Sequence, residues 1–398
     1  MTPAYDDGRV VIYEGDARDV LRGLPDESVH CVVTSPPYWG LRDYGTATWE
    51  GGEAGCDHRE STPSRTAASI AVSRLDGGKG NVHRSHECRG DCGRCGARRI
   101  DAQLGLEPTP EAYVERMVEV FREVRRVLRD DGTLWLNLGD SYATRWATIR
   151  PDSARGIRGE ENGRTRREGP APGGLKDKDL VGIPWRAAFA LQDDGWWLRR
   201  DIIWAKPHPM PESVEDRCTT AHEYLFHLAK SARYYYDAEA IREPVTGGAH
   251  TRGDGVNPKA RWKTPDGWDT STGNGGHGGF HRNGREAGRV KQNASFSAAV
   301  TDLVLKRNKR SVWTIATAPF PEAHFATFPP DLVKPCVLAG CPHDGVVLDP
   351  FAGAGTALLV AKELGRRAIG IELKPEYIAM TVGRLRQDVL PLVPAPAP

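Results

Sequence analysis

The stretch VHCVVTSPPYW, residues 29–39, predicts a buried strand that ends in a stiff turn. Residues 29–33 form a short run rich in β-branched side chains, which is typical of a strand inside a sheet. Pro36 and Pro37 cannot continue that strand, because each lacks a backbone N–H and has a fixed φ. Open α/β sheets bind their ligands at such turns, where parallel strands reach their carboxyl ends.

This turn carries groups that suit a planar base with an exocyclic amine. Ser35 offers a hydroxyl, the prolines offer backbone carbonyls, and Tyr38 offers an aromatic face. The oxygen atoms can accept hydrogen bonds from the amine while the ring stacks on the base. Taken alone, the stretch could also be a strand terminator with a surface tyrosine, because short motifs occur by chance.

A second stretch, VVLDPFAGAGTALLVA at residues 346–361, predicts a strand, a glycine turn and a helix in succession. This context is typical of a nucleotide-binding turn, in which glycines let a ligand approach the backbone. The turn lacks the Gly-Lys-Ser/Thr of a triphosphate-gripping loop. The next strand, residues 367–372, ends in Glu372, whose carboxylate is placed to accept hydrogen bonds from ribose hydroxyls.

Together, TSPPY at residues 34–38 and DPFAGAGT at residues 349–356 closely resemble the amino-group DNA methyltransferases, which use S-adenosylmethionine. The catalytic motif precedes the cofactor motif, an order similar to that of the permuted class called beta. The resemblance covers most of the chain apart from two polar inserts. It implies an α/β, Rossmann-like methyltransferase fold with a mostly parallel sheet, an antiparallel hairpin and permuted strand order.

The resemblance also implies site residues. Ser35, Pro36, Pro37 and Tyr38 would form the catalytic turn. Asp16 would bind the adenine amine of the cofactor, although capping the helix at residues 17–24 is an equally good and compatible role. The segment containing Phe328 would pack against the methionine part of the cofactor. The full set of implied cofactor-binding residues is Asp16, Thr34, Phe328, Asp349, Pro350, Phe351, Gly353, Gly355, Thr356 and Glu372.

The residue before Pro-Pro-Tyr bears on the base that is methylated. Serine at this position resembles the N4-cytosine enzymes, whereas Asp or Asn is commoner in N6-adenine enzymes, so N6-adenine methylation is the alternative. Ring-carbon methylation needs a thiolate, and the turn contains no cysteine. Two further alternatives are a zinc-bearing DNA-binding protein without catalysis and a methyltransferase for RNA or protein amides.

Length and composition set further limits. The chain has 398 residues and a net charge of +1, so any surface that binds DNA must be local. It has no apolar run long enough to span a membrane and no signal peptide at its start. We therefore expect a cytoplasmic protein that acts on double-stranded DNA, with a cognate restriction enzyme as a candidate partner. The eight cysteines favour metal binding over disulfides in such a reducing compartment.

Composition divides the chain into segments. We expect the catalytic domain at residues 1–50, 101–240 and 311–390, with a mobile loop at 144–178 and a disordered tail at 391–398. Residues 241–310 are polar and basic with interleaved aromatics, which favours contacts with DNA over a basic linker. The resemblance implies a target-recognition insert at this position. Residues 51–100 form another polar insert without hydrophobic periodicity.

The insert at residues 51–100 carries a candidate metal site. Cys56 and His58 are followed by a Cys-x2-Cys-Gly knuckle at Cys92 and Cys95. Two such pairs supply the number and kind of ligands that tetrahedral zinc requires, and a metal would explain how so polar a segment folds. His83, His86 and Cys88 are spare candidates, and reduced thiols in a loop without metal are the alternative.

Two further patterns predict regular structure outside the motifs. Thr109 and Pro110 open an amphipathic helix with an N-cap and a first-turn proline, and residues 130–132 are expected to end it before a strand at 133–138. Residues 196–204 and 222–228 have strand patterns and predict the antiparallel hairpin.

Overall fold

The computed structural model describes residues 1–40, 46, 48–53, 55–58, 92, 94–101, 103–143, 174–176, 178–244, 306–317 and 328–386. Several predictions fall outside these ranges: the spare ligands His83, His86 and Cys88, most of the loop at 144–178, most of the insert at 241–310, and the tail. Within the described residues, no helix is long and apolar enough to cross a membrane.

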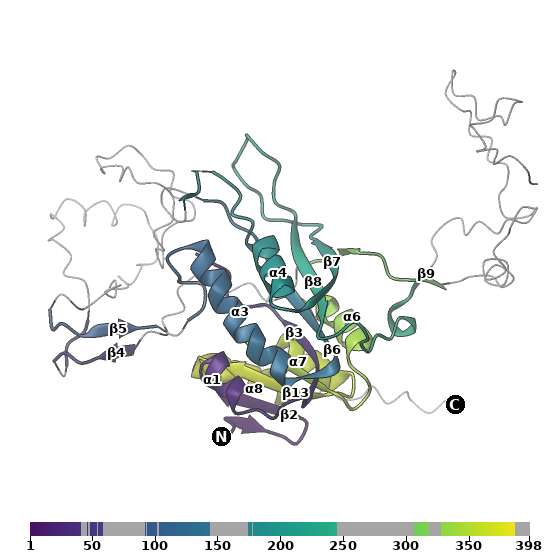
Figure 1. The fold of residues 1–398 in the computed structure, drawn as a ribbon, viewed down its shortest axis with the longest axis horizontal. Helices are drawn as coiled ribbons and strands as arrows, with labels where there is room; N and C mark the ends of the chain where they lie inside the picture. The colour runs from purple at the N-terminus through teal and green to yellow at the C-terminus, as the bar shows by residue number, and fades with distance from the viewer. Residues whose placement is uncertain are drawn as a thin grey trace, which may run out of the picture. The chain divides into compact units, whose positions relative to one another are not determined.

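The fold is built on a nine-stranded sheet in the order β1-β2-β13-β12-β3-β6-β8-β7-β11 (Figure 1). Strands β2, β13, β12, β3 and β6 are parallel, and β8 runs antiparallel to both β6 and β7. This arrangement confirms the predicted mostly parallel sheet with an antiparallel hairpin. The strands are β1 (Tyr5–Asp6), β2 (Val10–Glu14), β3 (Val29–Thr34), β6 (Leu128–Leu138), β7 (Trp197–Ala205), β8 (His222–Ala229), β11 (Val312–Thr314), β12 (Val346–Asp349) and β13 (Arg367–Glu372).

The permuted order of the chain is visible at the centre of this sheet. The late strands β12 and β13 lie between the early strands β2 and β3, with Leu348 paired to Val32 and Ile369 paired to Val11. In Figure 1 the yellow-green strands near the end of the chain accordingly lie beside purple strands near its start. The two sequence motifs follow β3 and β12, which are neighbours, so the sheet brings both turns to one edge.

Two groups of helices cover opposite faces of the sheet. Val32 and Leu134 join the core cluster of α1, α3 and α4, whereas Gly340 of α6 lies close to Cys31 and Thr133. Because successive strand residues point to opposite faces, α6 must cover the other side, where it contacts α7. The helices are α1 (Ala17–Arg22), α3 (Pro110–Val127), α4 (Ile183–Asp193), α6 (Pro330–Gly340), α7 (Thr356–Glu363) and α8 (Pro375–Arg386).

Helix α3 begins as predicted but ends earlier. The hydroxyl of Thr109 accepts a hydrogen bond from the Ala112 N–H, and Pro110 is the first helical residue. The helix stops at Val127, and Leu128 already pairs with Val29 as the first residue of β6. The expectation that residues 130–132 end the helix was wrong, because pairing of Leu128 with Val29 already starts the strand, which continues across this polar segment with a shift of register against β3.

The remaining described elements belong to the inserts. Strands β4 (Thr48–Glu50) and β5 (Arg98–Ile100) form an antiparallel hairpin at the two ends of the first insert. A separate compact unit spans Ala238–Arg310 and overlaps the predicted second insert. In that unit a short 3-10 helix, η2 (Glu239–Ile241), precedes β9 (Glu243–Pro244), which pairs with β10 (Lys306–Arg307). A role for this unit in target recognition stays a prediction.

Candidate active site

One cavity opens where the parallel strands reach their carboxyl ends, and both predicted turns line it. The turn after β3 contributes Ser35, Pro36, Pro37 and Tyr38, and the turn after β12 contributes Pro350, Phe351, Gly353 and Thr356. The ends of β2 and β13 add Asp16 and Glu372, and Phe328 completes the predicted set on the wall. This is the edge at which open α/β sheets bind nucleotides.

The glycine turn is fixed by the acid at the end of the next strand. Gly353 has a φ of 51° and donates its N–H to Oε2 of Glu372 at 2.8 Å. The other oxygen of Glu372 accepts from the Lys374 N–H at 2.9 Å, and burial raises the pKa of this carboxyl. Glu372 therefore faces the cavity from a fixed position, where a carboxylate can accept from ribose hydroxyls.

Gly355 is required for a different reason from the one the motif suggests. Its φ is 73°, and a Cβ there would lie 2.2 Å from Cγ2 of Thr381 in α8. This glycine does not line the cavity; it lets α7 and α8 approach each other beneath the turn. A direct contact between Gly355 and the cofactor stays a prediction, and the position of Gly355 outside the cavity lining does not favour it.

Thr34 and Asp349 form a buried pair behind the cavity rather than part of its wall. The Thr34 hydroxyl donates to Oδ1 of Asp349 at 2.6 Å, and the Phe351 N–H donates to the same oxygen at 3.1 Å. Both side chains are about 1% exposed, and burial raises the pKa of Asp349 to about 7. The pair ties the end of β3 to the end of β12, so it holds the two turns in register.

Asp16 has the capping role and also faces the cavity. Its Oδ1 accepts from the Arg18 N–H at 2.9 Å at the start of α1, and the Arg18 guanidinium lies 3.3 Å from the same oxygen. Because Asp16 also lines the cavity, the capping role and a contact with the cofactor amine are compatible.

A polar network lies behind the Ser-Pro-Pro-Tyr turn. Ser35 Oγ is 3.2 Å from Oδ1 of Asn137, which lies on β6, and Tyr38 Oη donates to Oε2 of Glu223 on β8 at 2.7 Å. The Asn137 amide nitrogen donates to the Tyr224 carbonyl at 3.1 Å, which directs its oxygen toward Ser35. Ser35 Oγ also lies 3.4 Å from Tyr38 Oη, so two acceptors in this network can take the Ser35 hydrogen. The Ser35 oxygen, which lines the cavity, can then accept a hydrogen bond from a group inside it.

The protonation of this network is set by burial and charge. Burial, followed by the nearby Glu223 carboxylate, raises the pKa of Tyr38 well above its ordinary value. Tyr38 therefore remains a neutral donor. Lys206, at the end of β7, forms an ion pair with the other oxygen of Glu223 and lies over the Trp204 ring at 4.5 Å.

Asn137 and Glu223 were not identified in the sequence. Asn137 is a polar residue inside the apolar run of β6, and this break in the sequence pattern could have identified it. In the structure its side chain is 3% exposed. Glu223 carries no such signal, since it lies near the exposed end of a strand. Tyr113 of α3 was also missed; its hydroxyl donates to the Pro37 carbonyl at 2.9 Å and supports the turn from below.

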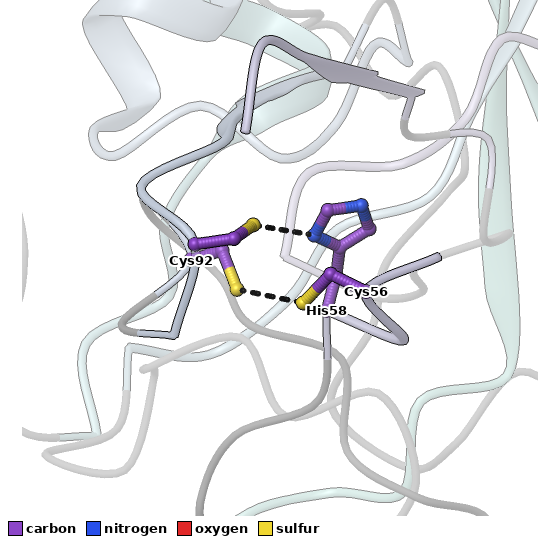
Figure 2. Close-up of side chains that lie close together, drawn as sticks. Cys56, His58 and Cys92 are labelled. Carbon is purple, nitrogen blue, oxygen red and sulfur yellow. Dashed lines mark hydrogen bonds between the residues drawn. The ribbon is translucent and has the colours of Figure 1, made fainter. Parts of the chain in front are cut away.

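The four predicted metal ligands come together outside this cavity. One potential ligand atom from each of Cys56, His58, Cys92 and Cys95 lies within 4.8 Å of all the others. Figure 2 shows Cys56 and Cys92 directed toward each other, with their sulfurs 3.8 Å apart. Hydrogen bonding by the Cys95 backbone N–H, followed by the His58 side chain, lowers the pKa of the Cys92 thiol to about 6.

Two of the separations within this group match a tetrahedral zinc site. Two sulfurs that are each about 2.3 Å from zinc are about 3.8 Å apart at the tetrahedral angle, and a sulfur and an imidazole nitrogen are about 3.5 Å apart. The corresponding separations are 3.8 Å for Cys56 and Cys92, and 3.5 Å from Cys95 Sγ to His58 Nδ1.

A glycine turn and a Ser-Pro-Pro-Tyr turn that open into one cavity define a methyltransferase that acts on an exocyclic amine. The chain belongs to a family described as DNA methylase, whose profile matches residues 29–383 and whose name pairs N6 with N4 methylation. The resemblance seen in the sequence is thus confirmed as to family.

Three curated relatives cover nearly the whole chain. It is 39% identical to the type II methyltransferase M.XycI of Xanthomonas campestris pv. cyanopsidis, over 94% of this chain and 87% of that one. It is 38% identical to M.Cfr9I of Citrobacter freundii, with 95% and 88% covered, and to M.SmaI of Serratia marcescens, with 94% and 90% covered.

A solved structure shares the fold. The PvuII DNA methyltransferase, titled cytosine-N4-specific, is 16% identical to this chain, with a TM-score of 0.53 and coverage of 98% of this chain and 91% of that one.

Proposed function

We propose that the protein methylates the exocyclic N4 amine of cytosine in double-stranded DNA, with S-adenosylmethionine as methyl donor. The observation that carries this proposal is the state of Ser35. Ser35 lines the cavity, and either Asn137 or Tyr38 can take its hydrogen, so a neutral acceptor is available to the space between the two turns. Serine before Pro-Pro-Tyr is also the residue that favours cytosine in the resembled enzymes.

The residues around the cavity fit the cofactor. The Glu372 carboxylate is held by two backbone N–H groups and suits ribose hydroxyls, and Asp16 suits an adenine amine. Phe328 and Phe351 add apolar surface for the rest of the molecule. When bound, S-adenosylmethionine supplies a methyl group on a positively charged sulfur, which an amine can attack.

The chain's own groups would then orient the amine. A base inside a duplex cannot reach a cavity at the edge of a sheet, so the target cytosine must be flipped out of the helix. Ser35 Oγ and the Pro36 carbonyl would accept the two amine hydrogens, and Tyr38 would stack on the ring. Both hydrogen bonds strengthen as positive charge develops on the nitrogen, so fixed dipoles and orientation lower the barrier.

The product identifies the base. Plasmid DNA from cells that express the protein would be digested to nucleosides and separated by mass spectrometry, with cells that express Ser35→Ala as the matched control. We expect N4-methylcytosine in the wild-type sample and much less of it in the Ser35→Ala sample. N6-methyladenine as the sole product would replace the cytosine assignment, and the absence of any methylated nucleoside despite cofactor binding would favour RNA or protein substrates.

The family and the inserts support further parts of this proposal. The relatives are type II methyltransferases, so a cognate restriction enzyme acting in the same cytoplasm is the partner we propose. The unit at Ala238–Arg310 would contact the recognition sequence. In the first insert, Cys56, His58, Cys92 and Cys95 would hold a structural zinc ion.

A further inference from the structure

We propose that the zinc site and the cavity are coupled: metal bound by Cys56, His58, Cys92 and Cys95 holds one wall of the methyl-donor cavity in place. This inference rests on the proposed function, because it takes S-adenosylmethionine as the cavity's ligand. It extends that function because the metal would stabilise the wall of the binding site and not only the fold of the insert.

The metal cluster has almost no core of its own. Cys92 and Ala97 are its buried residues among those described, with Trp49, Cys56 and Cys95 packed around them. So small an apolar cluster cannot offset the entropy of ordering the hairpin, which leaves the metal to do so. The rings of Trp49 and His58 stack at 4.4 Å, and Trp49 lies on β4, so a metal that fixes His58 also fixes this strand.

Asp101 connects the hairpin of β4 and β5 to residues that line the cavity. This residue follows β5 directly, and its Oδ1 accepts from the Thr46 hydroxyl at 2.8 Å and from the Gln103 N–H at 3.1 Å. Thr46 precedes β4, so a single carboxylate oxygen joins the two ends of the hairpin. Both Thr46 and Gln103 line the cavity.

The same segment also contacts the catalytic turn. The Gly40 N–H donates to the Gly105 carbonyl at 2.9 Å, and a Cβ on Gly105 would lie 2.9 Å from the Tyr38 carbonyl oxygen. The chain that leaves the hairpin therefore packs directly on the Ser-Pro-Pro-Tyr turn. Its position is set at one end by the zinc cluster and at the other by this contact.

The two binding events are coupled because metal and ligand both order the same wall, and the loss of conformational entropy on ordering it is incurred only once. Without metal, the ligand must order Thr46 and Gln103 as it binds, and its affinity falls accordingly. The effect is reciprocal, so bound ligand must tighten zinc by the same factor. We expect a factor of at least about 5, the lower end of typical couplings between sites.

The test measures both sides of this reciprocity on the full chain. Zinc content is determined by elemental analysis, zinc transfer to a colorimetric chelator is followed with and without S-adenosylmethionine, and donor affinity is measured by calorimetry for loaded and metal-free protein. We expect one zinc per chain, tighter zinc with donor present, and a matching loss of donor affinity without metal.

Variants at Asp101 separate coupling from metal binding. Asp101→Ala removes the shared acceptor and should retain zinc while the coupling factor falls toward one, whereas Asp101→Asn keeps an acceptor oxygen and should keep the coupling. Protein without zinc in reducing, chelator-free buffer would overturn the inference, as would equal donor affinity with and without metal; both results leave the methyltransferase proposal standing. Failure of the zinc-loaded protein to bind S-adenosylmethionine would overturn both proposals.

Discussion

Asp349→Asn should remove a specific part of the pH dependence of stability. The Asp349 carboxyl is buried, and its pKa is raised from 3.8 to about 7. Between these two values the folded protein keeps a proton that the unfolded chain releases, so the free energy of unfolding falls as pH rises through this interval. A shift of about 3 units, at 1.36 kcal/mol per unit, corresponds to a loss of about 4 kcal/mol.

Asparagine is a close test of this reasoning because it cannot ionise but keeps an oxygen for Thr34 and Phe351. The free energy of unfolding would be measured by urea titration at pH 4.5 and at pH 7.5 for the wild type and the variant. Contributions from other titrating groups cancel when the two pH differences are compared. The wild type should lose more stability than the variant, by an amount on the order of a few kcal/mol.

A matched control comes from an exposed carboxylate. Asp19→Asn changes a side chain that is 71% exposed and controls for the loss of a surface carboxylate. If Asp349→Asn and the wild type lost the same stability between the two pH values, the conclusion that burial keeps Asp349 protonated would be refuted.

Three other substitutions test the site and its support. Ser35→Ala should slow single-turnover methylation by about a hundred- to a thousandfold with little change in cofactor affinity. Ser231→Ala, which lies outside the cavity lining, should not slow it. Gly355→Ala should lower the melting temperature, because the new Cβ would lie 2.2 Å from an α8 side chain. Gly383→Ala is the control, since a Cβ there would meet open space, and it should not lower the melting temperature. Equal melting temperatures for the two variants would contradict this packing. His227 is buried and its pKa is lowered to about 3, so the free energy of unfolding falls as pH drops below about 6.5, where the unfolded chain takes up a proton that the folded protein does not. His227→Phe should therefore lose less stability between pH 7.5 and pH 5 than the wild type does.

Local rules explain why the two turns and the Cys-x2-Cys pair could be predicted from the sequence. Pro36 and Pro37 end a strand because each lacks a backbone N–H and has a fixed φ. The glycines of the second turn permit a tight turn directly after a strand because they tolerate positive φ. Only two residues separate Cys92 from Cys95, so their proximity is nearly guaranteed by spacing. None of these features depends on knowing which strands are neighbours.

The parts that were missed depend on pairing between distant segments. Asn137 reaches Glu223 only because β6 and β8 pair in a register that sets Asn137 opposite Leu225. The early start of β6 at Leu128 likewise requires β3 as a partner, which no pattern within residues 128–132 reveals. Asp101 directly follows the insert at residues 51–100, and no local pattern shows that this end of the insert returns to the cavity.

The hydrogen bond from Thr34 to Asp349 joins residues 315 positions apart, and this separation constrains how the protein is made. Strands β12 and β13 fill the space between β2 and β3, yet they are synthesised long after both of these strands. Throughout most of translation β2 and β3 are therefore both exposed edges, open to pairing with other chains. Closing so long a loop is slow compared with forming local contacts. A nascent chain that stops before residue 372 has its Ser-Pro-Pro-Tyr turn but no cofactor pocket, so methylation begins only after the last strand has entered the sheet.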